Sequence, residues 1–372
     1  MRNMATGRDS VIRKIDWYFI VFILVLSIIG LICLFSATHG AYAKGLSDRF
    51  VSQVIWLSVG WGLFALITLI DYKYLSRLSY IFYAMNLIAL ILVPIIGKSF
   101  YGARRWLDLG LFRYQPSETM KIALILLLAS YFSKKTKYDG LGVSDLIIPG
   151  ILTIPPFLLV VRQPDLGTGL LLLLISLSIV FFVKLKKSLI VAGIIISVGA
   201  VWVGWNFSFK DYQKNRVLTF LNPGSDPRGA GYNSIQSKIA VGSGEFVGKG
   251  FRKGTQSQLE FLPERHTDFI FSVLSEEFGF LGSFLTLLMF GLLFWRGIYF
   301  ASVARDKFGA LLAVGGLSYL FWHMLINTCM VIGLMPIVGV PLPLMSYGGS
   351  GMIATMISLG FVSSVAFRKN LF

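Results

Sequence analysis

Asp268 is the residue whose type and position in this sequence best suit catalysis. It stands where a polar segment, with Glu264 and His266, changes abruptly into a long apolar run. A carboxylate at the mouth of a membrane cavity can act as a general base on a substrate hydroxyl. The structural alternative is that Thr267 or Asp268 caps the helix that starts here. Capping accounts for one residue but leaves the surrounding ionisable cluster unexplained.

Further charged residues lie inside apolar runs. Glu276 and Glu277 follow Asp268 by about two helical turns, or about 12 Å of helical rise, and charges at such a depth need partners. One candidate is the run that begins at residue 116, where Glu118 and Lys121 share one helical face. Two interpretations of this pair remain open: an ion pair that fixes the bundle, or part of a polar substrate cavity.

A short loop places Arg104 and Arg105 beside Trp106. Guanidinium groups suit a diphosphate and an indole suits a sugar or prenyl face, so we predict that these residues bind substrate. The segment 207–267 adds basic residues that bind an anion or are simply solvated. They are Lys210, Lys214, Arg216, Arg228, Lys238, Lys249, Arg252, Lys253 and Arg265.

A glycine-rich stretch, residues 242–250, surrounds Lys249. It does not match a nucleotide-binding P-loop, because Gly250 replaces the Ser or Thr that should follow the lysine. Two interpretations remain open: backbone N–H groups that cradle a lipid diphosphate, or tight turns of a flexible loop.

The composition determines which elements must position these residues. Of the 372 residues 55% are hydrophobic and 14% are charged, which is too apolar for a soluble domain. Apolar runs near the length of a membrane-crossing helix recur along the chain. We therefore predict an all-α polytopic integral membrane protein with about ten transmembrane helices. Their expected ranges are 17–36, 51–70, 79–97, 116–133, 146–161, 168–183, 188–206, 268–295, 309–335 and 350–367.

Lysine and arginine in the short loops predict the orientation. They gather on one side, so we expect the N and C termini to be cytoplasmic. One long extracytoplasmic loop, about 207–267, joins spans 7 and 8 of a single membrane domain, 1–372. The Pro/Gly-broken stretch 162–167 predicts a tight hairpin between spans 5 and 6. The three histidines, His39, His266 and His323, lack metal-ligand spacing, so no zinc site is expected.

Several short motifs, taken in order, resemble the SEDS family (shape, elongation, division and sporulation) over nearly the whole chain. They are residues 102–106, 115–118 with Lys121, 163–168, 258–269 and 343–350. Residues 254–258 are more similar to members that act in cell elongation than to those that act in division. The departures are Glu245 in place of a glycine and Leu344 in place of an aromatic residue.

This resemblance implies a peptidoglycan glycosyltransferase that polymerises lipid II at the outer face of the bacterial cytoplasmic (inner) membrane. Asp268 matches the family's essential carboxylate and is the expected general base. The implied cofactor is a divalent cation, Mg or Mn, whose ligands the sequence does not identify, with no organic cofactor. The expected substrate-binding residues are Arg104, Arg105, Trp106, Glu118, Lys121, Arg216, Lys249, Gln258, Glu264 and His266.

The resemblance also implies partners: a class B penicillin-binding protein that crosslinks the strands, and the elongation machinery, without nucleic acid. The apolar faces of spans 8 and 9 are the expected docking surface. They include Phe284, Leu287, Leu288, Phe290, Leu293, Leu317, Leu320 and Phe321.

Two alternative functions are a lipid II flippase and a non-catalytic scaffold of the elongation machinery. Charges inside the membrane also occur in transporters, but the two halves show no inverted repeat, and the polar cluster lies at the outer surface. A scaffold would leave the Asp268 cluster without a purpose.

Overall fold

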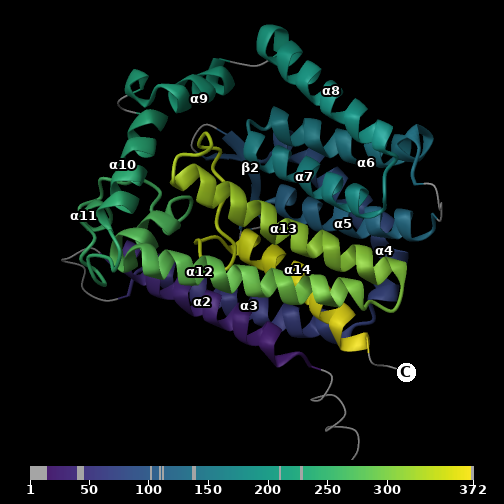
Figure 1. Ribbon diagram of the computed structural model, residues 1–372, viewed down its shortest axis with the longest axis horizontal. Helices are drawn as coiled ribbons and strands as arrows, with labels where there is room; N and C mark the ends of the chain where they lie inside the picture. Colours follow the sequence, from purple (N-terminus) through teal and green to yellow (C-terminus); the bar gives the residue numbers. More distant parts are fainter. Residues whose placement is uncertain are drawn as a thin grey trace, which may run out of the picture.

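The computed structural model describes residues 15–39, 46–100, 103–108, 110, 113–135, 140–208, 211–226 and 229–369. Within these residues ten long helices occupy the ten predicted ranges (Figure 1). They are α2 (Trp17–Thr38), α3 (Asp48–Leu69), α4 (Tyr72–Ile96), α5 (Pro116–Ser133), α6 (Val143–Arg162), α7 (Leu166–Phe182), α8 (Lys187–Val203), α12 (Ile270–Ser302), α13 (Lys307–Val331) and α14 (Gly349–Arg368).

Eight helices of the described chain have the length and apolar composition of a membrane span. The other two of the ten are α7, which is apolar but has 17 residues, and α5, which carries Glu118 and Lys121. Nearly all of α5 is buried, because it lies among α4, α7 and α13 in the interior of the bundle. The protein is therefore a multi-pass, mostly helical membrane protein whose central helix is surrounded by protein.

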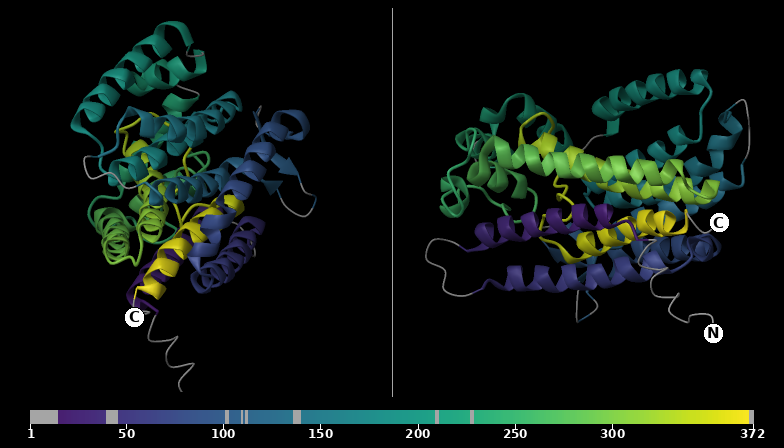
Figure 2. Two further views of the ribbon diagram at one scale, coloured as in Figure 1. Left: turned by 90° about the vertical axis from the view of Figure 1, so that its right-hand side faces the viewer. Right: turned by 60° about the horizontal axis from the view of Figure 1, so that its bottom comes forward.

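Both ends of the described chain lie at one end of the bundle. Arg296, near the end of α12, donates hydrogen bonds from Nε to the Asp16 carboxylate, at 3.0 and 3.1 Å, just before α2 begins. The ammonium group of Lys369, which follows α14, lies 5.0 Å from the centre of the Tyr299 ring on the same part of α12. Figure 2 shows the start of α2 and the end of α14 at this end of the molecule. This agrees with the prediction that both termini lie on one side of the membrane.

The opposite end of the bundle carries more regular structure than the sequence predicted. Three helices, α9 (Asp211–Leu221), α10 (Ala230–Ser243) and α11 (Thr255–Gln258), lie within the expected long loop. A small antiparallel sheet between α4 and α5 was not predicted. Its strands β1 (Lys98–Phe100), β2 (Ala103–Asp108) and β3 (Arg113–Tyr114) pair in the order β1-β2-β3.

The predicted hairpin between spans 5 and 6 is confirmed. Helix α6 ends at Arg162 and α7 starts at Leu166. The Asp165 carboxylate accepts a hydrogen bond from the Thr168 N–H at 3.1 Å and so caps the first turn of α7. This cap fixes the turn that borders the cavity described below.

Helix α12 bends at Gly279, which has a non-helical backbone with φ of 66°. The N–H groups of Phe280 and Leu281 leave the helical pattern and donate to the carbonyls of Glu245 and Phe246. The glycine-rich segment 242–250 therefore forms backbone hydrogen bonds with α12 at this bend. Gly248 has φ of 84°, and a Cβ there would lie 2.2 Å from the Glu277 carbonyl oxygen. Only glycine permits this approach.

Candidate active site

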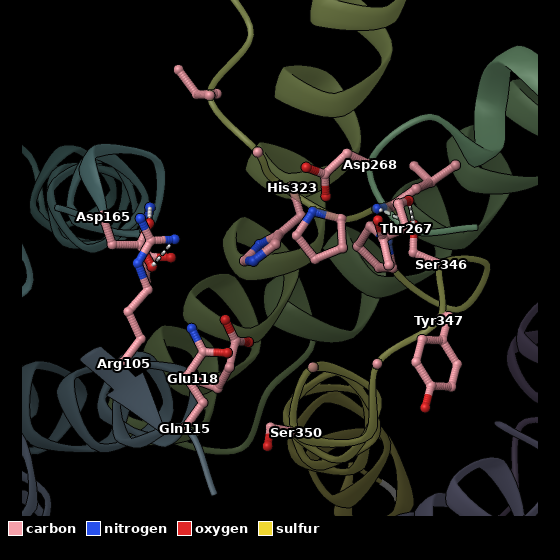
Figure 3. A pocket seen from close by; sticks show the side chains of 18 of the residues that line it. Arg105, Gln115, Glu118, Asp165, Thr267, Asp268, His323, Ser346, Tyr347 and Ser350 are labelled. Carbon is pink, nitrogen blue, oxygen red and sulfur yellow. Dashed lines mark hydrogen bonds and ion pairs between the residues drawn. The ribbon is translucent and has the colours of Figure 1, made fainter. Parts of the chain in front are cut away.

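A cavity of about 380 Å³ is formed where β2, the α6–α7 turn, α9 and the two chain segments 264–268 and 338–348 converge with the beginnings of α5 and α14 (Figure 3). Its polar lining contains both acidic and basic side chains. These polar residues are Arg105, Gln115, Glu118, Asp165, Thr168, Arg216, Glu264, Thr267, Asp268, Tyr319, His323, Ser346, Tyr347, Ser350 and Thr355.

Asp268 lies in the turn before α12 and its side chain faces the cavity (Figure 3). The residue at the helix N-cap is Phe269, and no side chain caps this end. The capping interpretation is therefore wrong. Thr267 instead donates its hydroxyl hydrogen to the carbonyl and carboxylate oxygens of Glu264.

The electrostatic surroundings of Asp268 make it a stronger base than an ordinary aspartate. Burial, followed by the negative charges of Glu264 and Asp165, raises the pKa of Asp268 to about 7, while Arg216 and Arg105 act in the opposite direction. A carboxyl group with a pKa near neutral can both take up and release a proton under physiological conditions.

Arg105 is held rigidly at the cavity wall. Its Nε donates to the Gln163 carbonyl at 3.1 Å, and a terminal nitrogen donates to the Pro164 carbonyl. Its guanidinium group also lies 3.8 Å from the Asp165 carboxylate. These contacts hold the guanidinium group in place on the opposite side of the cavity from Asp268 (Figure 3).

The predicted trio of Arg104, Arg105 and Trp106 is divided by the structure. Arg105 and Trp106 line the cavity. Arg104 is exposed and donates to the Pro94 carbonyl at 3.2 Å, away from the cavity. Of the three predicted residues, Arg104 alone lies outside the cavity lining.

A buried polar cluster lies at the base of the cavity. Lys121 Nζ donates to Glu118 Oε1 at 2.8 Å and lies 2.9 Å from His323 Nε2. The Tyr319 hydroxyl donates to Glu118 Oε2 at 3.1 Å, and His323 Nδ1 lies 2.7 Å from the Tyr319 carbonyl. These contacts fit a neutral imidazole that donates from Nδ1 and accepts from Lys121 at Nε2. Glu118 and Lys121 thus form an ion pair, with Glu118 at the cavity surface and Lys121 behind it.

Glu276 and Glu277 have partners other than the predicted ones. Glu276 accepts hydrogen bonds from Lys249 Nζ at 2.8 Å and from the Gln256 and Ser257 N–H groups. Glu277 accepts one from the Ser36 hydroxyl. The proposed pairing with the Glu118–Lys121 helix is wrong, because the folded outer segment supplies these contacts instead.

Lys249 and Gln258 do not line the cavity. The Lys249 ammonium group neutralises buried Glu276, and Gln258 Nε2 donates to the Ser36 carbonyl at 3.1 Å. The Lys249 and Gly250 N–H groups donate to the Glu276 and Glu277 carbonyls, both at 3.0 Å. Because these N–H groups are occupied, the interpretation of this segment as a diphosphate cradle is wrong.

The remaining predicted residues divide between the cavity and its margin. Arg216, from α9, and Glu264 line the cavity. His266 lies at the margin, 3.9 Å from the Glu264 carboxylate, and burial lowers its pKa, which favours the neutral form. Lys210 and Arg228 lie outside the described residues.

Sequence reasoning missed Asp165, His323 and Gln115 as lining residues. His323 offered a usable signal, because an ionisable side chain within an apolar run is rare without a function. Asp165 offered a weaker one, as a charge in a Pro/Gly-broken turn between two spans. Gln115 immediately precedes α5 and carried no signal beyond its motif.

The comparisons with known proteins agree with this fold and this site. The family model described as "Cell cycle protein" and labelled with FtsW, RodA and SpoVE matches residues 16–371. The chain is 40% identical to the peptidoglycan glycosyltransferase MrdB of Escherichia coli K12, covering 99% of this chain and 97% of that protein. It is 30% identical to the peptidoglycan glycosyltransferase RodA of Treponema pallidum, covering 96% and 99% of the two chains.

Two solved structures share the fold. One is a chain of a peptidoglycan synthase complex described as coordinating polymerization and crosslinking, with a TM-score of 0.81, 30% identity and coverage of 96% of this chain and 99% of that chain. The other is the rod shape determining protein RodA of Thermus thermophilus, with a TM-score of 0.70, 28% identity and coverage of 96% and 98%. The fold and cavity are those of a multi-pass membrane protein with a polar site at one end of its helix bundle. The chain belongs to the FtsW, RodA and SpoVE family, which is the SEDS family that its motifs resemble.

Proposed function

We propose that the cavity around Asp268 is the active site of this protein and that Asp268 is its general base. The protein is a peptidoglycan glycosyltransferase, and the proposed substrate is lipid II at the outer face of the bacterial cytoplasmic membrane during cell elongation. The observation that carries the proposal is a carboxyl group with a pKa of about 7, facing a cavity that also contains Arg105 and Arg216.

The other lining carboxylates are less available for proton transfer. Glu118, Asp165 and Glu264 each accept hydrogen bonds from neighbouring groups. Among the described residues no group donates a hydrogen bond to the Asp268 carboxylate, so its oxygens remain available to a substrate hydroxyl. His323 has contacts at both ring nitrogens and is a poor candidate for the base.

The proposed reaction is a displacement at the anomeric carbon of the donor sugar. Asp268 accepts the proton of the acceptor hydroxyl while the oxygen of that hydroxyl bonds to the anomeric carbon. The bond between that carbon and the prenyl diphosphate breaks, and the diphosphate leaves with the electron pair. Arg105 and Arg216 stabilise the negative charge that develops there. A diphosphate is already a good leaving group, so a second carboxylic acid, as used by glycosidases, is unnecessary.

The expected divalent cation stays a prediction. Among the described residues no group of three or more His, Cys, Asp or Glu side chains lies close enough together to hold a metal ion. The steps above use the protein's own side chains. Glycan synthesis measured with a chelator, and again after Mg or Mn is restored, tests the prediction directly.

We also propose that a class B penicillin-binding protein is the crosslinking partner. The support is the structural similarity to a chain of a peptidoglycan synthase complex. The predicted docking faces need correction, since Phe290, Leu293, Leu317 and Leu320 are buried within the bundle. The large apolar residues that α12 and α13 expose are Phe280, Leu281, Phe284, Leu285, Leu288, Trp295, Ile298, Tyr299 and Phe321.

Purified protein with lipid II tests the assignment of Asp268. Wild-type protein should produce glycan polymer on a gel, whereas Asp268→Asn should remain folded and produce none. Glu260→Gln is the matched control, because Glu260 lies on the same outer segment, is largely exposed and does not line the cavity. Polymer from Asp268→Asn at the wild-type rate would refute the assignment. Leaflet exchange of lipid II without polymer would instead indicate a flippase, and neither activity would indicate a scaffold.

A further inference from the structure

Asn327 is a fully buried residue of α13 that contacts the backbone of Asp268. Its Nδ2 donates one hydrogen bond to the Asp268 carbonyl at 2.8 Å and one to the Val340 carbonyl at 2.7 Å. A side-chain amide nitrogen carries two hydrogens, so both of its donors are used. Asn327 lies one helical turn beyond His323 and outside the motifs singled out in the sequence.

The two carbonyls belong to the two chain segments that flank the Asp268 carboxylate. One precedes α12, and the other lies between α13 and α14 and forms part of the cavity wall. Gly339, beside Val340, has φ of 73°, and a Cβ there would lie 3.3 Å from Asp268 Oδ2. Asn327 therefore joins the backbone that carries the carboxylate to the backbone packed against it.

A second contact joins the same two segments. The Ser346 hydroxyl donates to the Thr267 carbonyl at 2.6 Å and accepts from the Leu342 N–H at 2.8 Å. Gln53 of α3 donates to the Ser346 carbonyl at 3.0 Å and accepts from the Gly348 N–H. Ser346 holds the two segments together from the cavity side, and Gln53 does so from α3. Of these three residues, only Asn327 hydrogen-bonds to Asp268 itself.

The side-chain oxygen of Asn327, Oδ1, does not take part in these contacts. Asn327 Oδ1 is buried and has no hydrogen-bond partner within the part of the chain that the structure describes. A buried polar atom without a partner lowers stability. An apolar side chain would avoid that cost, so the two donors, rather than the amide as a whole, account for an asparagine here.

We propose that Asn327 is a positioning residue for glycosyl transfer, which fixes the backbone of Asp268 so that its carboxylate meets the acceptor hydroxyl. The proposal rests on the proposed function of Asp268. Asn327 does not line the cavity, so it acts through Asp268 and not on the substrate. Losing it should lower kcat and leave lipid II binding unchanged.

The principal test is Asn327→Leu, which has a similar size, lacks both donors and removes the unpaired oxygen. We expect kcat to fall about tenfold to a hundredfold, as for a slightly misplaced catalytic group, with KM within about twofold of wild type. The midpoint of thermal unfolding should fall only modestly, because the Asp268 and Val340 carbonyls lose their donors while the unpaired oxygen is removed. Asn327→Ser, with a single donor, should have an intermediate kcat, which gives a second measurement if the leucine variant folds poorly.

Thr328→Val is the matched control. Thr328 is the next residue, is buried, and has a hydroxyl without a hydrogen-bond partner in the described chain, but it has no hydrogen bond to Asp268. It should keep wild-type kcat and KM. An unchanged kcat in folded Asn327→Leu would overturn the inference, as would a loss of kcat matched by equal losses of binding and thermal stability. The proposed function fails separately, if Asp268→Asn remains active.

Discussion

The pKa of Asp268 determines how glycan synthesis should depend on pH. Burial raises this pKa to about 7, so the carboxyl is increasingly protonated below neutral pH and cannot then accept the hydroxyl proton. We expect the rate to fall about tenfold per pH unit below the pKa and to level off above it. Initial rates of lipid II polymerisation across the acidic and neutral range measure this limb. A rate that stays constant far below neutral pH would contradict a base with a raised pKa.

Arg105 and Arg104 offer a matched pair of substitutions on one strand. Arg105→Gln should weaken lipid II binding by about tenfold or more, because a charge-assisted contact to diphosphate is lost. Arg104→Gln should change binding little, because Arg104 points away from the cavity. Titration of purified variants with lipid II at low salt, where charge effects are largest, gives the comparison. Equal effects of the two substitutions would mean that the arginines act only through their net charge.

At the scale of elements, the glycine-rich segment and the bend in α12 depend on each other. Gly248→Ala would place a Cβ 2.2 Å from the Glu277 carbonyl oxygen and force φ of 84° on a non-glycine residue. We expect a loss of about 1–3 kcal/mol in stability, together with lower activity. The measurement is thermal unfolding of purified protein. Gly242→Ala is the control, because a Cβ there meets no atom within 4 Å and alanine favours the helix.

The long helices were predictable because each requires a long apolar run, and lipid leaves few alternatives to helix. The bend at Gly279 was not predictable, because glycine is common in membrane helices. The backbone that bonds to the bend comes from residues 245 and 246, which lie far away in the sequence. The small sheet was also missed, because its three short strands depend on their mutual pairing. Local sequence carries little information of that kind.

The same distinction applies to the site. Asp268 and Arg105 were found from residue type, position and motif, and both line the cavity. Lys249 satisfied similar criteria but neutralises a buried glutamate from another element. Asp165 and His323 reach the cavity only through the packing of the α6–α7 turn and α13. Tertiary contacts decide which charges pair with one another, and the sequence pattern does not show these contacts.

At the scale of the whole molecule, the division of the bundle into two ends suggests how a partner acts. The carboxylate of Asp268, the proposed general base, lies at the end opposite the described chain ends. The exposed apolar residues of α12 lie in the helix that follows Asp268. A partner helix packed on α12 would bias the position of the segment that carries Asp268, without adding a catalytic group.

We therefore expect the cognate class B penicillin-binding protein to co-purify with this protein and to change its rate of glycan synthesis. Rates should be compared with the transpeptidase intact, acylated at its active site, and absent. If the effect is transmitted by docking, the acylated partner should still change the rate. Equal rates with and without partner, together with no co-purification in mild detergent, would argue against the partnership.

Helix α8 has little protein around it (Figure 1). In the segment Lys187–Phe207, which includes α8, only 7% of an apolar 18-residue stretch is buried. In a bilayer the surrounding acyl chains supply the rest of its packing, so we expect its tilt to respond to the thickness of the bilayer. The chain continues from α8 into α9, which carries Arg216 to the cavity. We therefore expect the rate of glycan synthesis to depend on membrane thickness. Nanodiscs that differ only in acyl-chain length should give different rates.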